Sequence, residues 1–287
     1  MQFICFLLIL LFTTYSATST AASDKIILTV QPDVYADYLC LLNERSPLEI
    51  TDFKGECSRR DVVDIILLQQ ALHLGGFDLP VKFRTGQFEL RNRKLLEEGF
   101  LLVSVDTFWL TEAQSVQEHL YISEPMLRNG EYIAGLYTSP NNKKALASRT
   151  LQQVQKLSGV SSKNWSGDWR AMQQLGLKKL VNEPIWVAQV KLVDRQFVDF
   201  MLAPFNVDFA RNGVILELIP QIAVKLAGSR HFVISKYHLL GEAAFKALNI
   251  GIATMRQRGL IHKAYADAGF FYAIEQNWTF INEQLTD

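Results

Sequence analysis

Short apolar strands alternate with helix-length segments along this 287-residue chain, and this alternation constrains the fold more than any other feature. Ile26–Val30 is a β-branched, apolar run, Asp61–Leu74 is nearly apolar all round and of helical length, and Pro80–Arg84 is the next strand. A helix between two strands predicts a parallel βαβ unit. The sequence therefore predicts an α/β fold in which the helix is buried against a sheet.

The next segments extend the pattern and indicate a ligand site. Glu89–Glu98 is a charged helix, and Phe100–Val105 is a buried strand that runs into the loop Asp106–Trp109. Ligands of parallel sheets bind beyond the carboxyl ends of the strands. We therefore expect a binding site at Asp106–Trp109 and at the end of the first strand, where Tyr35 follows.

A second unit begins after the strand Tyr132–Thr138. It contains strand-like Leu151–Leu157, a short helix at Asp168–Gln174, Leu177–Val181, a helix at Ile185–Val193, strands at Phe197–Ala203 and His231–Ser235, and a long amphipathic helix at Glu242–Arg258. There is no internal repeat and no low-complexity tract. The length suits two lobes of ordinary size.

The N-terminus predicts a processing signal. Residues 1–23 carry no Lys, Arg, Asp or Glu, and the apolar run Phe3–Phe12 is far shorter than the ~20 residues that span a bilayer as a helix. Small residues follow at Ser16–Ser23, where a small-x-small cleavage site fits. We expect a secretory signal peptide at 1–23 and a mature, exported protein, with an uncleaved anchor as the alternative.

The cysteines agree with export. Cys5 leaves with the signal, and Cys40 and Cys57 allow a disulfide across 17 positions, worth about 3 kcal/mol in the chain-entropy model. No Cys/His cluster has metal-ligand spacing, and no dinucleotide, Walker A, nucleophile-elbow or zinc-protease motif occurs. The sequence therefore predicts no metal, no cofactor and no recognisable catalytic constellation.

The net charge of zero conceals two opposite segments. Residues 24–138 hold 11 basic and 18 acidic side chains, a net of −7, and residues 139–228 hold 12 and 6, a net of +6. Residues 229–287 add a net of +1. The overall balance argues against a nucleic-acid partner, which needs a basic excess. Facing lobes of opposite charge, or ordinary solvated surfaces, are both compatible with the two totals.

Four parts of the chain together carry a family resemblance. The first is the order of Ile26–Val30, Asp61–Leu74 and Val81–Arg84, the second is Tyr121-Ile122-Ser123-Glu124-Pro125-Met126 before Tyr132–Thr138, and the third is Val193–Asp199. The fourth is Ser229–Lys236, followed by Ala247-Leu248-Asn249, Gly251, Arg258-Gly259 and Tyr265–Phe270. These segments, which extend over nearly all of the mature chain, resemble the type II periplasmic solute-binding proteins, in particular the family 3 (amino-acid-type) receptors.

The resemblance implies a two-lobe α/β clamshell with a ligand cleft between the lobes and two hinge strands. Residues 24–133 and 230–287 would form the first lobe, and residues 134–229 the second. It also implies a small-molecule ligand, a monomer, and an ABC permease or a membrane sensor as partner. One position departs from the family: its Thr-x-x-Arg, whose Arg binds the ligand carboxylate, reads Thr111-x-x-Gln114 here.

The candidate ligand-binding residues each have a structural alternative. Asp106 is a polar ligand or a helix N-cap, Trp109 stacks on a ligand or packs in the core, and the Trp165 side chain has the same two options. Arg230 contacts ligand or holds the lobes together. The full set is Tyr35, Asp106, Thr107, Trp109, Glu124, Trp165, Arg195, Asp199 and Arg230.

Three functions remain open from the sequence. The first is capture of a small polar or aromatic-bearing solute by clamshell closure, for ABC-type uptake. The second is a ligand-sensing or protein-interaction module on the same fold. The third, which rests on analogy with cyclohexadienyl dehydratases, is an enzyme that uses a cleft carboxylate as general acid or base.

Overall fold

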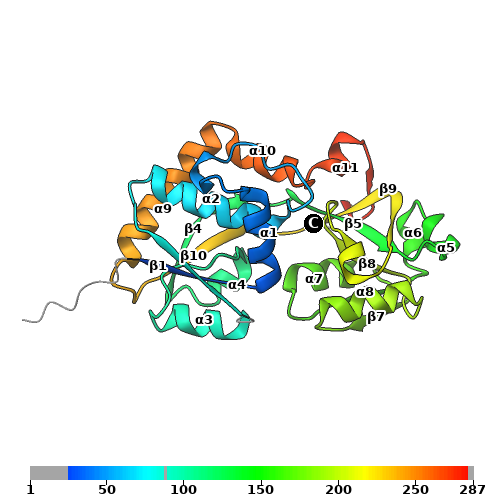
Figure 1. Ribbon diagram of the computed structural model, residues 1–287. Coiled ribbons are helices and arrows are strands. Elements are labelled where there is room, and N and C mark those ends of the chain that lie inside the picture. Colours follow the sequence, from blue (N-terminus) through cyan, green and yellow to red (C-terminus); the bar gives the residue numbers. More distant parts are fainter. Residues whose placement is uncertain (1–24, 87–88, 284–287) are drawn as a thin grey trace, which may run out of the picture.

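The chain forms two lobes that lie side by side in a computed structural model (Figure 1), which describes residues 25–86 and 89–283. The predicted signal peptide, 1–23, lies outside the described residues. The two-lobe α/β architecture expected from the strand–helix alternation is confirmed.

The first lobe contains two small sheets. Its elements are β1 (Ile26–Val30), α1 (Pro32–Leu42), a 3₁₀ turn (Pro47–Glu49), α2 (Arg60–Leu74), β2 (Val81–Thr85), α3 (Glu89–Glu97), β3 (Phe108–Trp109), α4 (Leu110–Gln114), β4 (Leu120–Leu127), β10 (Arg230–Ser235), α9 (Gly241–Gln257) and α10 (Leu260–Asp267). β1 and β2 pair in parallel, as the predicted βαβ unit requires, and β10 lies between β3 and β4. The α2 helix is buried over most of its length, as its apolar sequence predicts.

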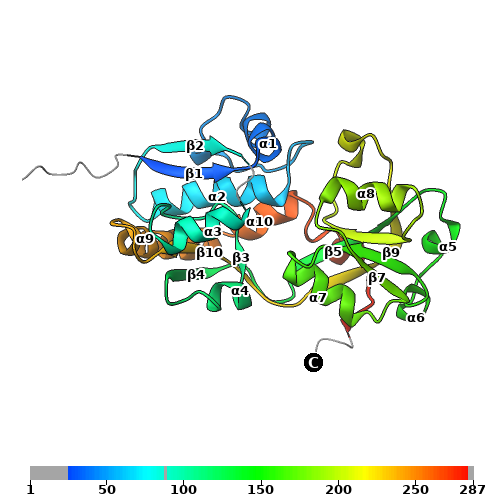
Figure 2. The ribbon, with the colours of Figure 1, turned by 90° about the horizontal axis from the view of Figure 1, so that it is seen from below.

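The second lobe is one six-stranded sheet with helices around it. Its elements are β5 (Tyr132–Thr138), α5 (Lys143–Leu146), α6 (Leu151–Val154), β6 (Ser158–Ser161), α7 (Ser166–Gln174), β7 (Lys179–Asn182), α8 (Trp186–Asp194), β8 (Phe200–Ala203), a 3₁₀ turn (Phe209–Asn212), β9 (Glu217–Leu226), α11 (Tyr272–Glu275) and β11 (Thr279–Phe280). The strand order is β11-β9-β5-β8-β6-β7. Figures 1 and 2 both show α7 on the side of this lobe that faces the first.

The chain crosses between the lobes twice near the site, between β4 and β5 and between β9 and β10. The backbone N–H of Gly228, on the second crossing, donates to Asn129 Oδ1 on the first at 2.8 Å. The tail then returns to the second lobe, because β11 pairs in parallel with β9. The sequence predicted that all of 230–287 belongs to the first lobe. For β11 this prediction is wrong, because β11 lies in the sheet of the second lobe.

Two predicted strands have another structure. Leu151–Leu157 begins with helix α6, because Thr150 caps its N-terminus and accepts from the Gln153 N–H at 3.3 Å. In Phe100–Val105, Phe100 is exposed and the other five residues form an irregular buried segment with a single β-bridge, between Val103 and Ile234. The Ser104 hydroxyl accepts the Asp106 N–H at 3.2 Å, and this local turn competes with strand pairing.

The first lobe's core depends on close contact between α2 and α9. A Cβ added to Gly251 would lie 1.9 Å from the Ala71 carbonyl oxygen, and one added to Gly75 would lie 2.0 Å from the Ala247 carbonyl oxygen. Only glycine permits such an approach of the two backbones. This packing fixes α2, whose N-terminal end carries the charged residues described next.

Candidate ligand site between the lobes

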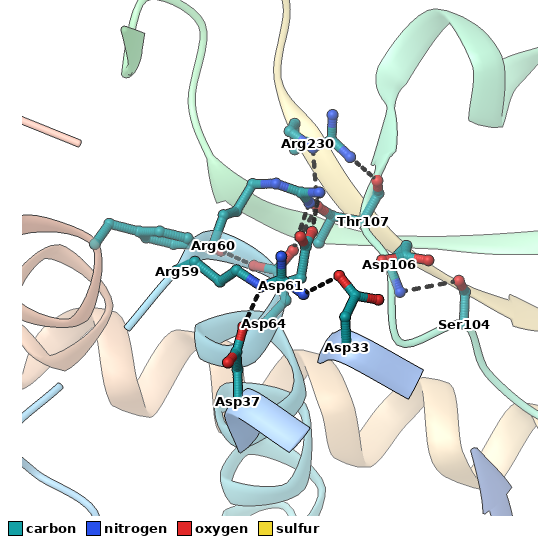
Figure 3. Close-up of polar contacts among 11 residues, drawn as sticks. Asp33, Asp37, Arg59, Arg60, Asp61, Asp64, Ser104, Asp106, Thr107 and Arg230 are labelled. Atoms are coloured by element: carbon teal, nitrogen blue, oxygen red, sulfur yellow. Dashed lines mark hydrogen bonds and ion pairs between the residues drawn. The ribbon is translucent and has the colours of Figure 1, made fainter. Parts of the chain in front are cut away.

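The N-terminus of α2 is held by a disulfide and by ion pairs. Cys40, in α1, is bonded to Cys57, with 6.0 Å between the two Cα atoms. Arg59 follows and forms ion pairs with Asp33 at 2.8 Å and with Asp37 at 3.1 Å (Figure 3). These links position the first turn of α2.

Arg60 is neutralised by two carboxylates of its own helix. Its guanidinium forms ion pairs with Asp61 and, at 2.9 Å, with Asp64. Burial alone would lower the pKa of Arg60, but the two carboxylates outweigh it and raise that pKa well above its ordinary value. The fully buried Asp64 also accepts from the Thr107 hydroxyl at 3.0 Å and from the Tyr265 hydroxyl at 2.6 Å.

Arg230 enters the same region from the start of β10. Its Nε donates to Thr107 Oγ1 at 2.9 Å, and its Nη2 donates to the Thr107 carbonyl (Figure 3). The guanidinium carbon lies 4.8 Å from the Trp109 ring centroid and 5.8 Å from that of Tyr132. Burial, reinforced by Arg60, lowers the pKa of Arg230, but an arginine keeps its charge at neutral pH.

Two more carboxylates complete what we call the interlobe cluster, defined as Arg60, Asp61, Asp64, Asp106, Asp168 and Arg230. Asp106 follows the irregular segment of the first lobe, and Asp168 lies in the first turn of α7 in the second lobe. Burial, with Asp61 adding to it, raises the pKa of Asp106 to about 6. Burial also raises the pKa of Asp168 to about 6, although Arg230 opposes this shift.

The lobes touch directly where α4 meets α7. A Cβ added to Gly167 would lie 2.3 Å from two atoms of the Trp109 indole, so the ring lies directly on the α7 backbone. The Ser166 hydroxyl, at the start of α7, donates to Glu112 of α4. Trp109 is only 4% exposed as a result. The structure is thus a closed arrangement of the two lobes.

The residues predicted from the sequence separate into two groups. Asp106, Thr107, Trp109 and Arg230 lie together in or against the interlobe cluster. Each of the others lies outside it. Tyr35 packs on Phe83 with ring centroids 5.0 Å apart, and Trp165 packs on Trp186 with centroids 6.0 Å apart. Glu124 is exposed on β4, Arg195 is exposed at the end of α8, and Asp199 is hydrogen-bonded to Ser158 at the start of β6.

Asp199 is held by hydrogen bonds within the second lobe. Its carboxylate accepts from the Ser158 N–H at 2.7 Å, from the Ser158 hydroxyl at 2.8 Å and from the Asn142 amide at 2.9 Å. Burial acts to raise the pKa of Asp199, but these hydrogen bonds prevail and lower it. Its role is to join β6, β8 and the loop before α5.

Sequence reasoning missed Arg60, Asp61, Asp64 and Asp168 as site residues. A signal for the first three was present, because charged residues with Arg60 and Asp64 four apart interrupt the start of an otherwise apolar, buried helix. Asp168 appears in the sequence analysis only as the first residue of a predicted helix. Its approach to residues more than fifty positions earlier depends on tertiary structure.

The described residues contain no group of three or more His, Cys, Asp or Glu side chains arranged to hold a metal ion. Within the same ranges, no helix is long and apolar enough to cross a membrane. The residues between the lobes offer hydrogen bonds, ion pairs and aromatic faces.

The two lobes, their two crossings and the charged cluster between them form a two-lobe fold of the periplasmic-binding-protein kind, as comparison with solved structures shows. No protein-family model matches the sequence, and no curated protein matches it. Solved structures match over most of the chain. An amino acid ABC transporter substrate-binding protein, AbpA from Streptococcus pneumoniae bound to L-arginine, is 14% identical with a TM-score of 0.55, covering 88% of this chain and 96% of that one.

Two other neighbours show how widely this fold is used. The GluR0 ligand-binding core in complex with L-glutamate is 11% identical with a TM-score of 0.56, over 85% of this chain and 97% of that one. The ancestral amino-acid-binding protein AncCDT-1, a precursor of cyclohexadienyl dehydratase, is 16% identical with a TM-score of 0.53, over 86% and 96%. At these identities the comparison establishes the fold of this chain.

Proposed function

We propose that this chain is an exported, periplasmic solute-binding protein, which captures a small polar molecule between its lobes by clamshell closure and delivers it to an ABC-type permease. One observation carries the proposal: both lobes and a hinge strand contribute charged side chains to a single, partly buried cluster. A ligand that contacts both halves of such a cluster favours the closed state by its differential affinity.

The closure contacts support the same function. Trp109 against Gly167 and Glu112 with Ser166 join the lobes beside the cluster, so a bound molecule would be shielded from solvent. The solved neighbours support it too, since AbpA is an ABC transporter substrate-binding protein. The predicted signal peptide supports export, and a membrane sensor as the receiving partner is the alternative to a permease.

A thermal-shift screen of a metabolite library followed by small-angle scattering tests the proposal. At least one compound is expected to raise the melting temperature and to give the scattering of the closed form. Arg230→Gln is expected to abolish the response, whereas Arg195→Gln, a matched change at an exposed arginine, is expected to preserve it. A library that produces no response would refute solute capture.

A dehydratase-type enzyme is a second candidate, favoured by the raised pKa of Asp106 and Asp168, both about 6. A carboxyl group that titrates there suits general acid–base work near neutral pH. Turnover of a prephenate-like acid, lost in Asp168→Asn, is the expected result for an enzyme. Recovery of the acid unchanged after long incubation would exclude that activity.

A further inference from the structure

The hydroxyl group of Thr107 is fully occupied by residues of the interlobe cluster. Arg230 Nε donates to its oxygen at 2.9 Å, Arg60 Nη1 donates at 3.4 Å, and the hydroxyl itself donates to Asp64 Oδ2 at 3.0 Å. A hydroxyl has one hydrogen to donate and two lone pairs that accept, so these contacts use all of it. Thr107 is also only 2% exposed. Its side chain therefore acts on its neighbours and has no capacity left for a ligand.

The direction of the Thr107 hydroxyl follows from the chemistry of its partners. An arginine side chain has only donors, so Arg60 and Arg230 can only give hydrogens to the oxygen. The Asp64 carboxylate, which is ion-paired with Arg60 at 2.9 Å, accepts. The single hydroxyl hydrogen consequently points at Asp64, and both lone pairs face the two guanidinium groups.

Two guanidinium groups of like charge thus meet at one oxygen atom, and they are not equally compensated. Asp61 and Asp64 form ion pairs with Arg60. Among the residues that the structure describes, none forms an ion pair with Arg230. Burial and, after it, the positive charge of Arg60 lower the pKa of Arg230. Arg230 therefore depends on Thr107 for a position that its positive neighbour opposes.

Thr107 holds the Arg230 guanidinium by one edge. Nε and Nη2, the two nitrogens of that edge, donate to the hydroxyl oxygen and to the carbonyl oxygen of Thr107 (Figure 3). The arginine fork is planar and rigid, so two hydrogen bonds to one residue fix its plane. The Trp109 ring, with its centroid 4.8 Å from the guanidinium carbon, packs against the face. Nη1, on the other edge, makes no hydrogen bond to any residue that the structure describes.

We propose, building on the solute-capture function above, that Thr107 is a positioning residue of the binding site: its hydroxyl and carbonyl hold one edge of Arg230 and leave the edge with Nη1 for the solute. Thr107 is thus expected to act through Arg230, whereas the sequence suggested direct contact with a ligand. Hydrogen bonds that involve a charged group contribute more than neutral ones, so loss of the hydroxyl is expected to weaken solute binding about 10- to 100-fold.

Three variants separate the hydroxyl from the rest of the side chain. Thr107→Val removes the hydroxyl and keeps a branched side chain of similar shape, whereas Thr107→Ser keeps the hydroxyl and is expected to behave like the unchanged protein. Thr138→Val is the matched control, because Thr138 is fully buried in the second lobe and its hydroxyl donates to the Asp199 carbonyl at 2.6 Å. It makes the same chemical change away from the cluster.

The position of Arg230 can be measured without any ligand, from the proton–nitrogen NMR signal of its Nε–H group, which Arg230→Gln identifies. A hydrogen-bonded, buried Nε–H exchanges slowly with water. The unchanged protein, Thr107→Ser and Thr138→Val are expected to show slow exchange, and Thr107→Val is expected to lose it. A slowly exchanging signal at an unchanged chemical shift in Thr107→Val would overturn the proposal, and so would loss of the signal in folded Thr107→Ser.

Binding then distinguishes a positioning role from a contribution to folding alone. The compounds that raise the melting temperature in the library screen serve as calorimetric probes for each variant. An affinity loss of at least tenfold in Thr107→Val, absent from Thr107→Ser and from Thr138→Val, supports the proposal. Equal losses in Thr107→Val and Thr138→Val overturn it and leave solute capture standing. A library without any such compound refutes solute capture, and the NMR comparison still decides whether Thr107 positions Arg230.

Discussion

The contact between Trp109 and Gly167 makes a sharp prediction about closure. Replacement of Gly167 by Ala places a methyl group 2.3 Å from the indole Cε2 and Cζ2 atoms, where ordinary contacts are 3.4–4 Å. The lobes must therefore separate locally by about 1 Å or more, and overpacking of this kind costs about 1–3 kcal/mol. Since 1.4 kcal/mol is a factor of ten, the closed state should become about 5- to 150-fold less populated.

The same substitution has an opposite effect on folding. Gly167 is in the first turn of α7, where alanine is a better helix former than glycine by up to about 1 kcal/mol. Gly167→Ala is thus expected to preserve or raise the free energy of unfolding while it weakens ligand affinity and expands the molecule. Small-angle scattering, calorimetry and urea unfolding measure the three effects.

A double-mutant cycle isolates the cause. With Trp109→Ala already in place, the methyl group no longer meets the indole, so Gly167→Ala should add no further loss of affinity. The reasoning is refuted if Gly167→Ala alone leaves scattering and affinity unchanged, or if its cost persists without the indole. Either result would mean that the two residues do not form the closing surface in solution.

Three predictions concern stability. Folding raises the Asp168 pKa from 3.8 to about 6, so between these values the folded chain binds more protons than the unfolded chain, and its stability falls as the pH rises. Asp168→Asn should remove about 2–3 kcal/mol of this fall in the free energy of unfolding. Urea unfolding at pH 4.5 and 7.5 measures the difference. Asp199→Ala should lower the free energy of unfolding by about 2–4 kcal/mol near neutral pH, because three hydrogen bonds are lost, and should leave ligand affinity unchanged. The loss should become smaller below pH 4, where Asp199, whose pKa is lowered by folding, is protonated in the folded chain too. A loss of affinity equal to that of a cluster variant would contradict the structural role of Asp199. Replacement of Cys40 and Cys57 by serine should lower stability by about 3 kcal/mol, and an unchanged melting temperature would show that the disulfide contributes nothing.

Local patterns in the sequence were sufficient for most of the elements. The run Ile26–Val30 has the bounds of β1, and the apolar segment Asp61–Leu74 is one residue shorter than α2. Leu151–Leu157 was read as a strand although Leu151, Val154 and Leu157 recur at helical spacing after a capping threonine. That error came from weighing local apolar content above periodicity.

The interlobe cluster was predictable only in part, for a physical reason. Asp106, Thr107 and Trp109 follow a buried segment, so the rule for parallel sheets locates them. Arg60 reaches the cluster through tertiary packing within the first lobe, and Asp168 reaches it only when the second lobe lies against the first. The rise in the pKa of Asp168 on burial depends on atoms from the opposite lobe, and no local sequence pattern carries that information.

The distribution of the cluster between the lobes implies an order of events on binding. Arg60, Asp61, Asp64, Asp106 and Arg230 all belong to the first lobe or its returning strand, and hydrogen bonds through Thr107 hold three of them in place without help from the second lobe. The second lobe adds Asp168 and the start of α7. Under the proposed solute capture, a ligand would thus meet a largely preformed half-site on the first lobe, and closure would then add Asp168. Because a preformed half-site costs little to order, we expect discrimination between ligands to fall mainly on the closing step.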